Sequence, residues 1–296
     1  MQKRTDLAAE ARQLWQESAG ETTKLPGVQA RDYKVHGVAV TEVTILDRRG
    51  AQALGKPEGS YFTLDFAAIR DQADRGIRRA TETLGKLLQK MLALEPRQSV
   101  LVIGLGNPAV TPDAIGPEAL QHLLITRHLV EQLPVQFGHF RPVSALSPGV
   151  LGTTGLESAE VVRGAVAYAR PTAVVVIDAL AARDPARLCS TVQLADSGIV
   201  PGSGVGNSRA AFTRQTLGVP VVAVGIPTVV DAGTLAMDLL ERNGYSLPKD
   251  PLPRGMMVTP GDIDAGIKRM ARIVGCGISL ALHPELSLEE IQGFIC

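Results

Sequence analysis

Cysteine, aromatic side chains and excess charge of either sign are all scarce in this chain of 296 residues. The three cysteines, Cys189, Cys276 and Cys296, form no Cys-x-x-Cys motif and no Cys/His cluster. We therefore expect neither a disulfide framework nor a structural zinc site. We expect the protein to work in a reducing cytoplasmic compartment. Lys and Arg number 30, as do Asp and Glu, and aromatic residues make up 4%. Without a basic field or stacking surfaces for bases, we expect no direct contact with nucleic acid.

Long hydrophobic runs are missing as well. No stretch of eighteen apolar residues exists, so no membrane-spanning helix is expected. The opening MQKRTDLAAEARQLW is charged and lacks the apolar centre of a secretory signal. Apolar residues still make up 45% of the chain, which is enough to bury a large core. We expect a single main domain over residues 7–296 with a smaller inserted or appended part.

The spacing of apolar residues predicts the secondary structure. After Pro96 it indicates apolar strands alternating with helices, which is typical of an α/β fold: three layers, with helices on both faces of a mostly parallel sheet. Thr259 is expected to cap the last long helix, with Pro260 at its first position. Strands are predicted over 36–46, 61–66, 99–105, 172–178 and 219–225, and helices over 69–91, 113–129, 155–170, 233–243 and from 259 onward.

Two aspartates stand where predicted strands end. The stretch Val100–Pro117, VLVIGLGNPAVTPDAIGP, passes from a strand through a glycine turn to Asp113 at a helix start. The stretch Ala173–Asp178, AVVVID, delivers Asp178 as its last residue. In open α/β sheets ligands bind at the carboxyl edge of the strands, so we expect one site with two carboxylates. A helix start favours ionised Asp113, whereas an apolar setting raises the pKa of Asp178.

Such a pair can act as acid and base on a water molecule without metal or cofactor. The plainer alternatives are that Asp113 only complements a helix dipole and that Asp178 only caps a strand–loop junction. Other chemistry finds less support. The Gly-rich stretch Gly202–Asn207 lacks the P-loop pattern and is expected to be a loop near the site, within a wall over 196–209. The histidines show no metal-ligand spacing, and no serine lies in a G-x-S-x-G setting.

Five stretches together resemble the germination proteases of spore-forming bacteria. They are RTDLAAEA, GLGNPAVTPDAIGP, VVVIDALAAR, DSGIVPGSGVGNSR and VGIPTVVDA, in this order along nearly the whole chain. One departure is Pro108, where the family often has an aromatic residue after the GLGN turn. The resemblance implies an atypical aspartic endopeptidase with the fold of the hydrogenase-maturation endopeptidases, a phosphorylase/hydrolase-like fold. Its catalytic aspartates map by motif onto Asp113 and Asp178.

The resemblance also implies a biology. The family degrades small acid-soluble spore proteins during germination, in the cytoplasm of the spore core. Its members assemble as homotetramers and are made as zymogens that process themselves. They use no cofactor or metal, and the membrane is no partner.

Family substrates are cut after the first glutamate of Thr-Glu-Phe/Ile-Ala-Ser-Glu, and Thr5-Asp6-Leu7-Ala8-Ala9-Glu10 has the same order of side-chain types. We therefore expect autocleavage between Asp6 and Leu7, with residues 1–6 as a propeptide; the plainer alternative is a helix start capped by Thr5. A glutamate before the cut needs a basic partner, for which Arg183 and Arg209 are candidates. Asn107 is a further candidate for substrate binding.

Two other functions stay open at this stage. One is a metal-assisted peptidase of the hydrogenase-maturation type. The other is a binding module without enzymatic activity on the same fold. A chelator distinguishes the first from the two-aspartate enzyme, and Asp113→Ala distinguishes the second.

Overall fold

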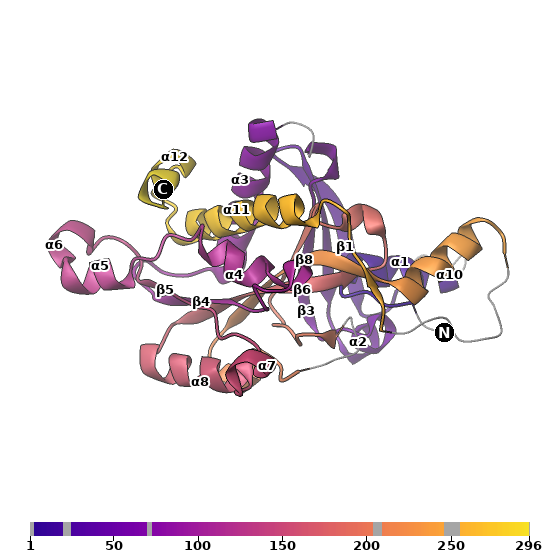
Figure 1. Ribbon diagram of the computed structural model, residues 1–296, viewed down its shortest axis with the longest axis horizontal. Helices are drawn as coiled ribbons and strands as arrows, with labels where there is room; N and C mark the ends of the chain where they lie inside the picture. Colours follow the sequence, from indigo (N-terminus) through magenta and orange to yellow (C-terminus); the bar gives the residue numbers. More distant parts are fainter. Residues whose placement is uncertain (1–2, 20–24, 70–72, 204–208, 246–254, 296) are drawn as a thin grey trace.

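The computed structural model describes residues 3–19, 25–69, 73–203, 209–245 and 255–295. Within these ranges the strands form one nine-stranded sheet in the order β1-β2-β3-β7-β8-β6-β4-β5, and β9 pairs with β8 (Figure 1). The strands are β1 (Val28–Val35), β2 (Val38–Ile45), β3 (Gly59–Asp65), β4 (Val100–Gly104), β5 (Val143–Leu146), β6 (Ala173–Ala182), β7 (Thr191–Ala195), β8 (Val221–Asp231) and β9 (Met257–Val258).

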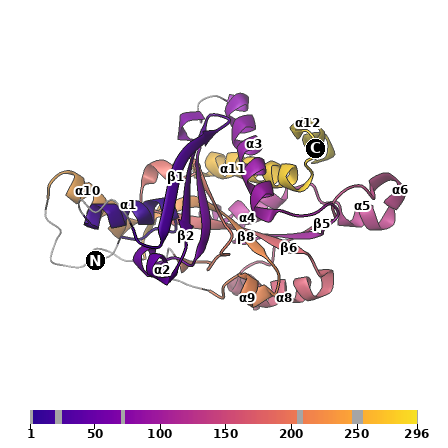
Figure 2. The ribbon, with the colours of Figure 1, turned by 180° about the vertical axis from the view of Figure 1, so that it is seen from behind.

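The sheet is mixed, with a parallel and an antiparallel part. Strands β8, β6, β4 and β5 pair in parallel with one another, as expected for strands joined through helices. Strands β1, β2, β3 and β7 pair antiparallel, and β7 joins β8 antiparallel. Strands β1 and β2 lie side by side in Figure 2. The antiparallel part is therefore built largely from the first 65 residues and is appended to the parallel part through β7.

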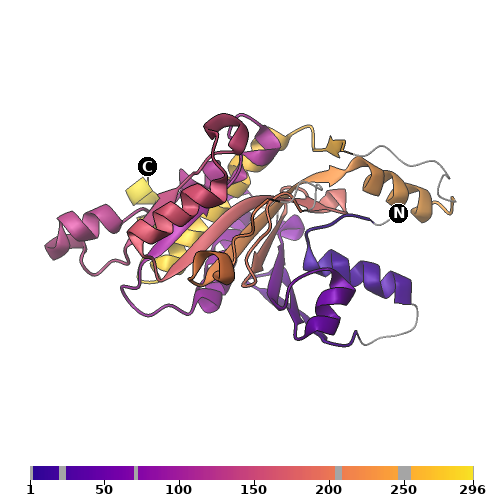
Figure 3. The same cartoon turned by 90° about the horizontal axis from the view of Figure 1, so that it is seen from below.

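Helices cover both faces, which confirms the three-layer α/β class. Helices α3, α4 and α11 lie on one face and α7 and α8 on the other (Figure 1), while α1 and α2 lie beside the antiparallel strands (Figure 3). None of the helices in the described ranges is long and apolar enough to cross a bilayer. The helices are α1 (Ala8–Ala19), α2 (Arg48–Leu54), α3 (Ala73–Leu92), α4 (Ile115–Leu120), α5 (Arg127–Gln132), α6 (Pro134–Phe137), α7 (Leu151–Thr154), α8 (Ser158–Ala169), α9 (Arg214–Leu217), α10 (Ala232–Arg242), α11 (Ile263–Leu282) and α12 (Leu288–Ile295), with 3-10 turns η1 (Ala67–Ile69), η2 (Thr111–Asp113) and η3 (Pro185–Arg187).

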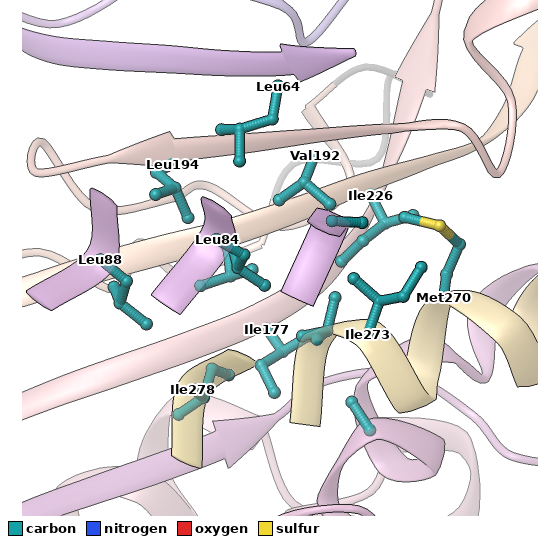
Figure 4. Packing of buried hydrophobic residues seen from close by; sticks show 14 of the residues in the cluster. Leu64, Leu84, Leu88, Ile177, Val192, Leu194, Ile226, Met270, Ile273 and Ile278 are labelled. Carbon is teal, nitrogen blue, oxygen red and sulfur yellow. The ribbon is translucent and has the colours of Figure 1, made fainter. Parts of the chain in front are cut away.

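The main core lies between the sheet and the two long helices α3 and α11. Leu84 and Leu88 of α3 and Met270 and Ile278 of α11 meet Ile177 of β6 and neighbouring strand residues (Figure 4). Because side chains alternate across a strand, the odd-numbered residues of β6 around Ile177 face this core and the even-numbered ones face α8. Asp178 therefore lies on the α8 side of the sheet.

The prediction of one continuous helix over residues 113–129 is wrong. The chain forms the turn η2, the short α4 and, after a break, α5. The break at Thr126 has a cause in tertiary structure, because its hydroxyl donates to the carbonyl of Arg141 and accepts from Val143 N–H at 3.0 Å. These two hydrogen bonds hold Thr126 against the start of β5. They stabilise the chain at this point more than another turn of helix would.

The start of the last long helix was also predicted wrongly. Asp262, not Thr259, is the cap residue of α11. The Thr259 hydroxyl donates to the carbonyl of Thr228 at 2.9 Å, so it fastens the chain to β8 rather than capping the helix. The helix itself runs to Leu282 and presents an apolar face to the core, with Ile267, Met270, Val274 and Ile278.

Candidate active site

The glycines that follow β4 let two stretches of backbone touch. A Cβ on Gly106, whose φ is +120°, would lie 1.9 Å from the carbonyl oxygen of Asp113. A Cβ on Gly104 would lie 2.5 Å from the carbonyl oxygen of Gly116, and one on Gly116 would lie 2.1 Å from that of Leu105. Only glycine fits such contacts, and Gly106 also needs the positive φ. The GLG turn thus clamps the segment that carries Asp113 against the end of β4.

Asp113 ends the turn η2 and is held by this clamp. Its Oδ2 accepts a hydrogen bond from Asn107 N–H at 2.8 Å. Burial raises the pKa of Asp113, and the Asn107 hydrogen bond opposes the rise. Asp113 ends a single 3-10 turn rather than starting a long helix, so burial, and not a helix dipole, sets the direction in which its pKa moves.

Asp178 lies within β6 rather than at its end, which corrects the prediction. Strand β6 runs on to Ala182 because β8 stays paired with it as far as Val230. The Asp178 side chain is 5% exposed, and its Oδ1 accepts from Ala179 N–H at 3.0 Å. Burial, followed by the nearby charge of Asp113, raises the pKa of Asp178 well above its ordinary value.

The two carboxyl groups share one cavity of about 680 Å³ at the carboxyl ends of β4 and β6. Sequence reasoning brought Asp113 and Asp178 together, and the structure places both in this lining. Asn107 and Arg209 also line it, and the Arg209 guanidinium lies 3.4 Å from Glu157 Oε1, between two half-exposed side chains. The remaining walls come from the start of α8, from α7, from the end of β6 and from residues 200–203.

Arg183 is bound elsewhere. Its Nε donates to Asp238 Oδ2 at 2.7 Å and its Nη1 to Glu17 Oε2 at 2.9 Å. These partners raise the pKa of the Arg183 guanidinium above its already high value, against the effect of burial. A side chain so engaged cannot receive a substrate carboxylate, so the prediction for Arg183 is corrected.

The N-terminal segment enters the cavity. Asp6 is one of the lining residues, and its N–H donates to Ala181 O at 2.9 Å. Its carboxylate accepts from Ala181 N–H at 2.9 Å and from the Ser203 hydroxyl at 3.0 Å. Strand β4 pairs with β6 only as far as Ile177, so the segment bonds to a part of β6 that extends beyond β4. The charge of Asp6 contributes to the raised pKa of Asp178.

The Asp6–Leu7 peptide is held on both sides. The Gln193 side chain donates through Nε2 to Asp6 O at 3.0 Å and accepts through Oε1 from Ala8 N–H at 2.7 Å. Leu7 is fully buried among Leu180, Ala182, Leu188 and Val230. In the sheet register, Asp178 pairs with Gly225 and Gly225 with Gln193, so the two side chains stand on one face about 10 Å apart across two strand spacings.

Sequence reasoning missed Gln193 and Ser203. The sequence analysis predicts no strand over residues 191–195, which form the short strand β7. Ser203 belongs to the expected Gly-rich loop, whose residues 204–208 lie outside the described ranges. Within those ranges, no group of three or more His, Cys, Asp or Glu side chains is placed to hold a metal ion.

An α/β fold in which one buried and one partly buried carboxyl group share a cavity defines a candidate hydrolase, and the comparisons with known proteins identify the class. The model of the germination protease family, a peptidase family, matches residues 8–243. The germination protease of Caldanaerobacter subterraneus subsp. tengcongensis is 42% identical over 98% of this chain and 97% of its own length. That of Clostridium tetani is 38% identical over the full length of both.

The chain belongs to the germination protease family and is a spore protease. Among solved structures, the hydrogenase maturation protease HycI from Thermococcus kodakarensis is 16% identical, with a TM-score of 0.34, over 65% of this chain and 98% of that one. At that TM-score the likeness supports no statement about function.

Proposed function

We propose that the protein is an endopeptidase in which Asp113 and Asp178 share one proton and activate a water molecule. The observation that carries the proposal is the presence of both carboxyl groups in one cavity, close enough for the charge of Asp113 to raise the pKa of Asp178. Two adjacent carboxyl groups cannot both ionise cheaply, so one proton stays between them near neutral pH. In the resting state Asp178 holds this proton, because its environment raises its pKa well above the ordinary value, whereas a hydrogen bond from Asn107 opposes the rise at Asp113.

The reaction then needs water alone. Ionised Asp113 takes a proton from the water, whose oxygen bonds to the carbonyl carbon of the peptide. The carbon–nitrogen bond breaks, and the proton of Asp178 passes to the leaving nitrogen. The products are a carboxyl group and an amine, and the proton now on Asp113 returns the pair to its starting state by exchange between the two groups.

Autocleavage at Asp6–Leu7 is the second part of the proposal, with residues 1–6 as a propeptide of a zymogen. Its support is the position of Asp6 in the cavity lining and the hydrogen bond from Gln193 to its carbonyl oxygen. A donor on this oxygen stabilises the negative charge that develops there in the transition state. Leu7 occupies an apolar site of the kind that the residue after the cut requires.

The substrates follow from the family. We propose that the enzyme cuts small acid-soluble spore proteins after the first glutamate of Thr-Glu-Phe/Ile-Ala-Ser-Glu, in the cytoplasm of the spore core and as a homotetramer. Arg209 and Asn107 are the proposed contacts for the substrate at the cavity wall. The weak pairing of Arg209 with Glu157 leaves its guanidinium able to turn toward a substrate carboxylate.

The test is incubation with a peptide containing Thr-Glu-Ile-Ala-Ser-Glu and identification of the cut bond by mass. We expect cleavage after the first glutamate by the wild type and by the control Asp264→Asn, which alters an exposed carboxyl of α11. We expect at least a hundredfold loss in Asp178→Asn and Asp113→Ala. Equal cleavage by all four proteins would refute the dyad, and cleavage by none of them would favour a binding module. Loss of activity with a chelator, restored by added metal, would favour the metal-assisted alternative.

A further inference from the structure

The residues before Asp6 lie on a row of acidic side chains. Lys3 Nζ contacts Asp238 Oδ1, and it lies 2.6 Å from Glu241 Oε2. Arg4 Nη1 lies 3.8 Å from Asp231 Oδ2. We name Asp231, Asp238 and Glu241 the acidic row. The first ends β8, and the other two belong to α10, which follows it without a break.

The acidic row is positioned independently of the segment that covers it. Asp231 caps α10 by accepting from Thr234 N–H at 2.8 Å. Asp238 accepts from Arg183 Nε at 2.7 Å. Positions 231, 234, 238 and 241 recur at three- and four-residue spacing, so they share one face of the helix. The row is thus a preformed surface whose charges persist when the N-terminal segment leaves.

The contact with Lys3 is largely shielded from water. The Lys3 side chain is 10% exposed and that of Asp238 is 4% exposed. Such a site discriminates between partners, because Asp238 and Glu241 attract a cation at this position and repel a like charge. A backbone contact fixes the register as well, since Arg4 N–H donates to the Thr234 hydroxyl at 3.1 Å.

We propose that the acidic row forms substrate subsites for basic residues upstream of the cut. The inference rests on the proposed function, in which the bond after Asp6 is the one hydrolysed. Arg4 then marks the third residue before the cut and Lys3 the fourth. Substrates are protein segments with Lys or Arg at these positions, followed by an acidic residue at the cut. The released segment 1–6 is itself a ligand of the row.

The test compares two peptides on the self-processed chain, verified by mass to begin at Leu7. One peptide is Lys-Arg-Thr-Glu-Ile-Ala-Ser-Glu, and the other has Ala-Ala in place of Lys-Arg. We expect kcat/KM to be about tenfold higher for the Lys-Arg peptide. We expect this ratio to shrink in 0.5 M salt, since salt screens charge pairs that are partly exposed.

Variants assign the preference to the row. Glu241→Gln removes a half-exposed charge whose partner is Lys3, and it is expected to lower the ratio several-fold. Glu131→Gln, which breaks an exposed pair with Arg127 on α5, is the matched control and is expected to keep the ratio. A second measurement is inhibition by the hexapeptide Met-Gln-Lys-Arg-Thr-Asp, which should exceed that by Met-Gln-Ala-Ala-Thr-Asp.

The outcomes separate the two proposals. Equal rates for both peptides, with equal inhibition by both hexapeptides, would overturn the basic subsites and leave the peptidase standing. A preference that Glu241→Gln and Glu131→Gln alter to the same extent would overturn the assignment to the acidic row. Cleavage of neither peptide would refute the proposed function and, with it, this inference.

Discussion

Asp178→Asn is expected to make the protein more stable, and increasingly so as the pH rises. The buried carboxyl has a raised pKa in the folded state, because burial and the charge of Asp113 disfavour its ionised form. In the unfolded chain the same group titrates at about 4. A group with a raised folded pKa contributes stability that is complete below the unfolded pKa and is lost as pH rises through the folded pKa.

The magnitude follows from one proton. Between the two pKa values the folded protein holds a proton that the unfolded chain has released. The free energy of unfolding of the wild type therefore falls by about 1.4 kcal/mol per pH unit relative to Asp178→Asn. Asparagine keeps the shape of the side chain and cannot ionise, so the difference reports the titration of this site.

The assay is urea denaturation at several pH values between 4 and 9, for the wild type, Asp178→Asn and Asp264→Asn. The last variant is the control, since its carboxyl is exposed. We expect the stability gained by Asp178→Asn to grow with pH and to level off above the folded pKa. A constant difference over the whole range, or a gain that shrinks with rising pH, would refute the assignment of a proton-holding buried Asp178.

Three further predictions follow from single contacts. Gln193→Ala removes the donor to the Asp6 carbonyl and should slow release of residues 1–6, followed by mass, by about 10²–10³-fold; an unchanged rate would exclude Gln193 from the reaction. Gly106→Ala forces a Cβ against the Asp113 carbonyl and should cost several kcal/mol in urea denaturation together with activity, because the clamp must open; wild-type stability would contradict the clamp. His283, buried beside Arg141 and Glu285, has its pKa lowered to about 4, chiefly by burial. The wild type should therefore lose about 3 kcal/mol as pH falls from 6.5 to 4, and His283→Phe should abolish that loss; equal acid sensitivity of the two proteins would refute it.

Strands β4, β6 and β8 of the parallel part could be predicted from the sequence because they begin as continuous runs of apolar residues. Val100–Gly104 and Ala173–Ile177 have no polar interruption. Strands β1, β5 and β7 escaped prediction because they are short or carry polar residues that only sheet neighbours explain. Strand ends failed for a similar reason, since β6 continues past Asp178 only because β8 accompanies it.

The candidate site was predictable in part. The glycine turn and the strand pattern brought Asp113 and Asp178 to one edge of the sheet, and the structure places both in one cavity. The role of Arg183 failed because Asp238 and Glu17, which neutralise it, come from elements far away in sequence. Gln193 could not have been found, because its contact with the Asp6–Leu7 peptide depends on the docking of the N-terminal segment.

The dependence of peptide hydrolysis on pH tests the shared proton most directly. The measurement is kcat/KM of the self-processed chain on a Thr-Glu-Ile-Ala-Ser-Glu peptide from acid to strongly alkaline pH. A pair that holds one proton predicts a rate that declines once the pH passes the raised pKa of Asp178 and both groups ionise. A rate that still climbs at strongly alkaline pH would contradict the two-carboxyl mechanism.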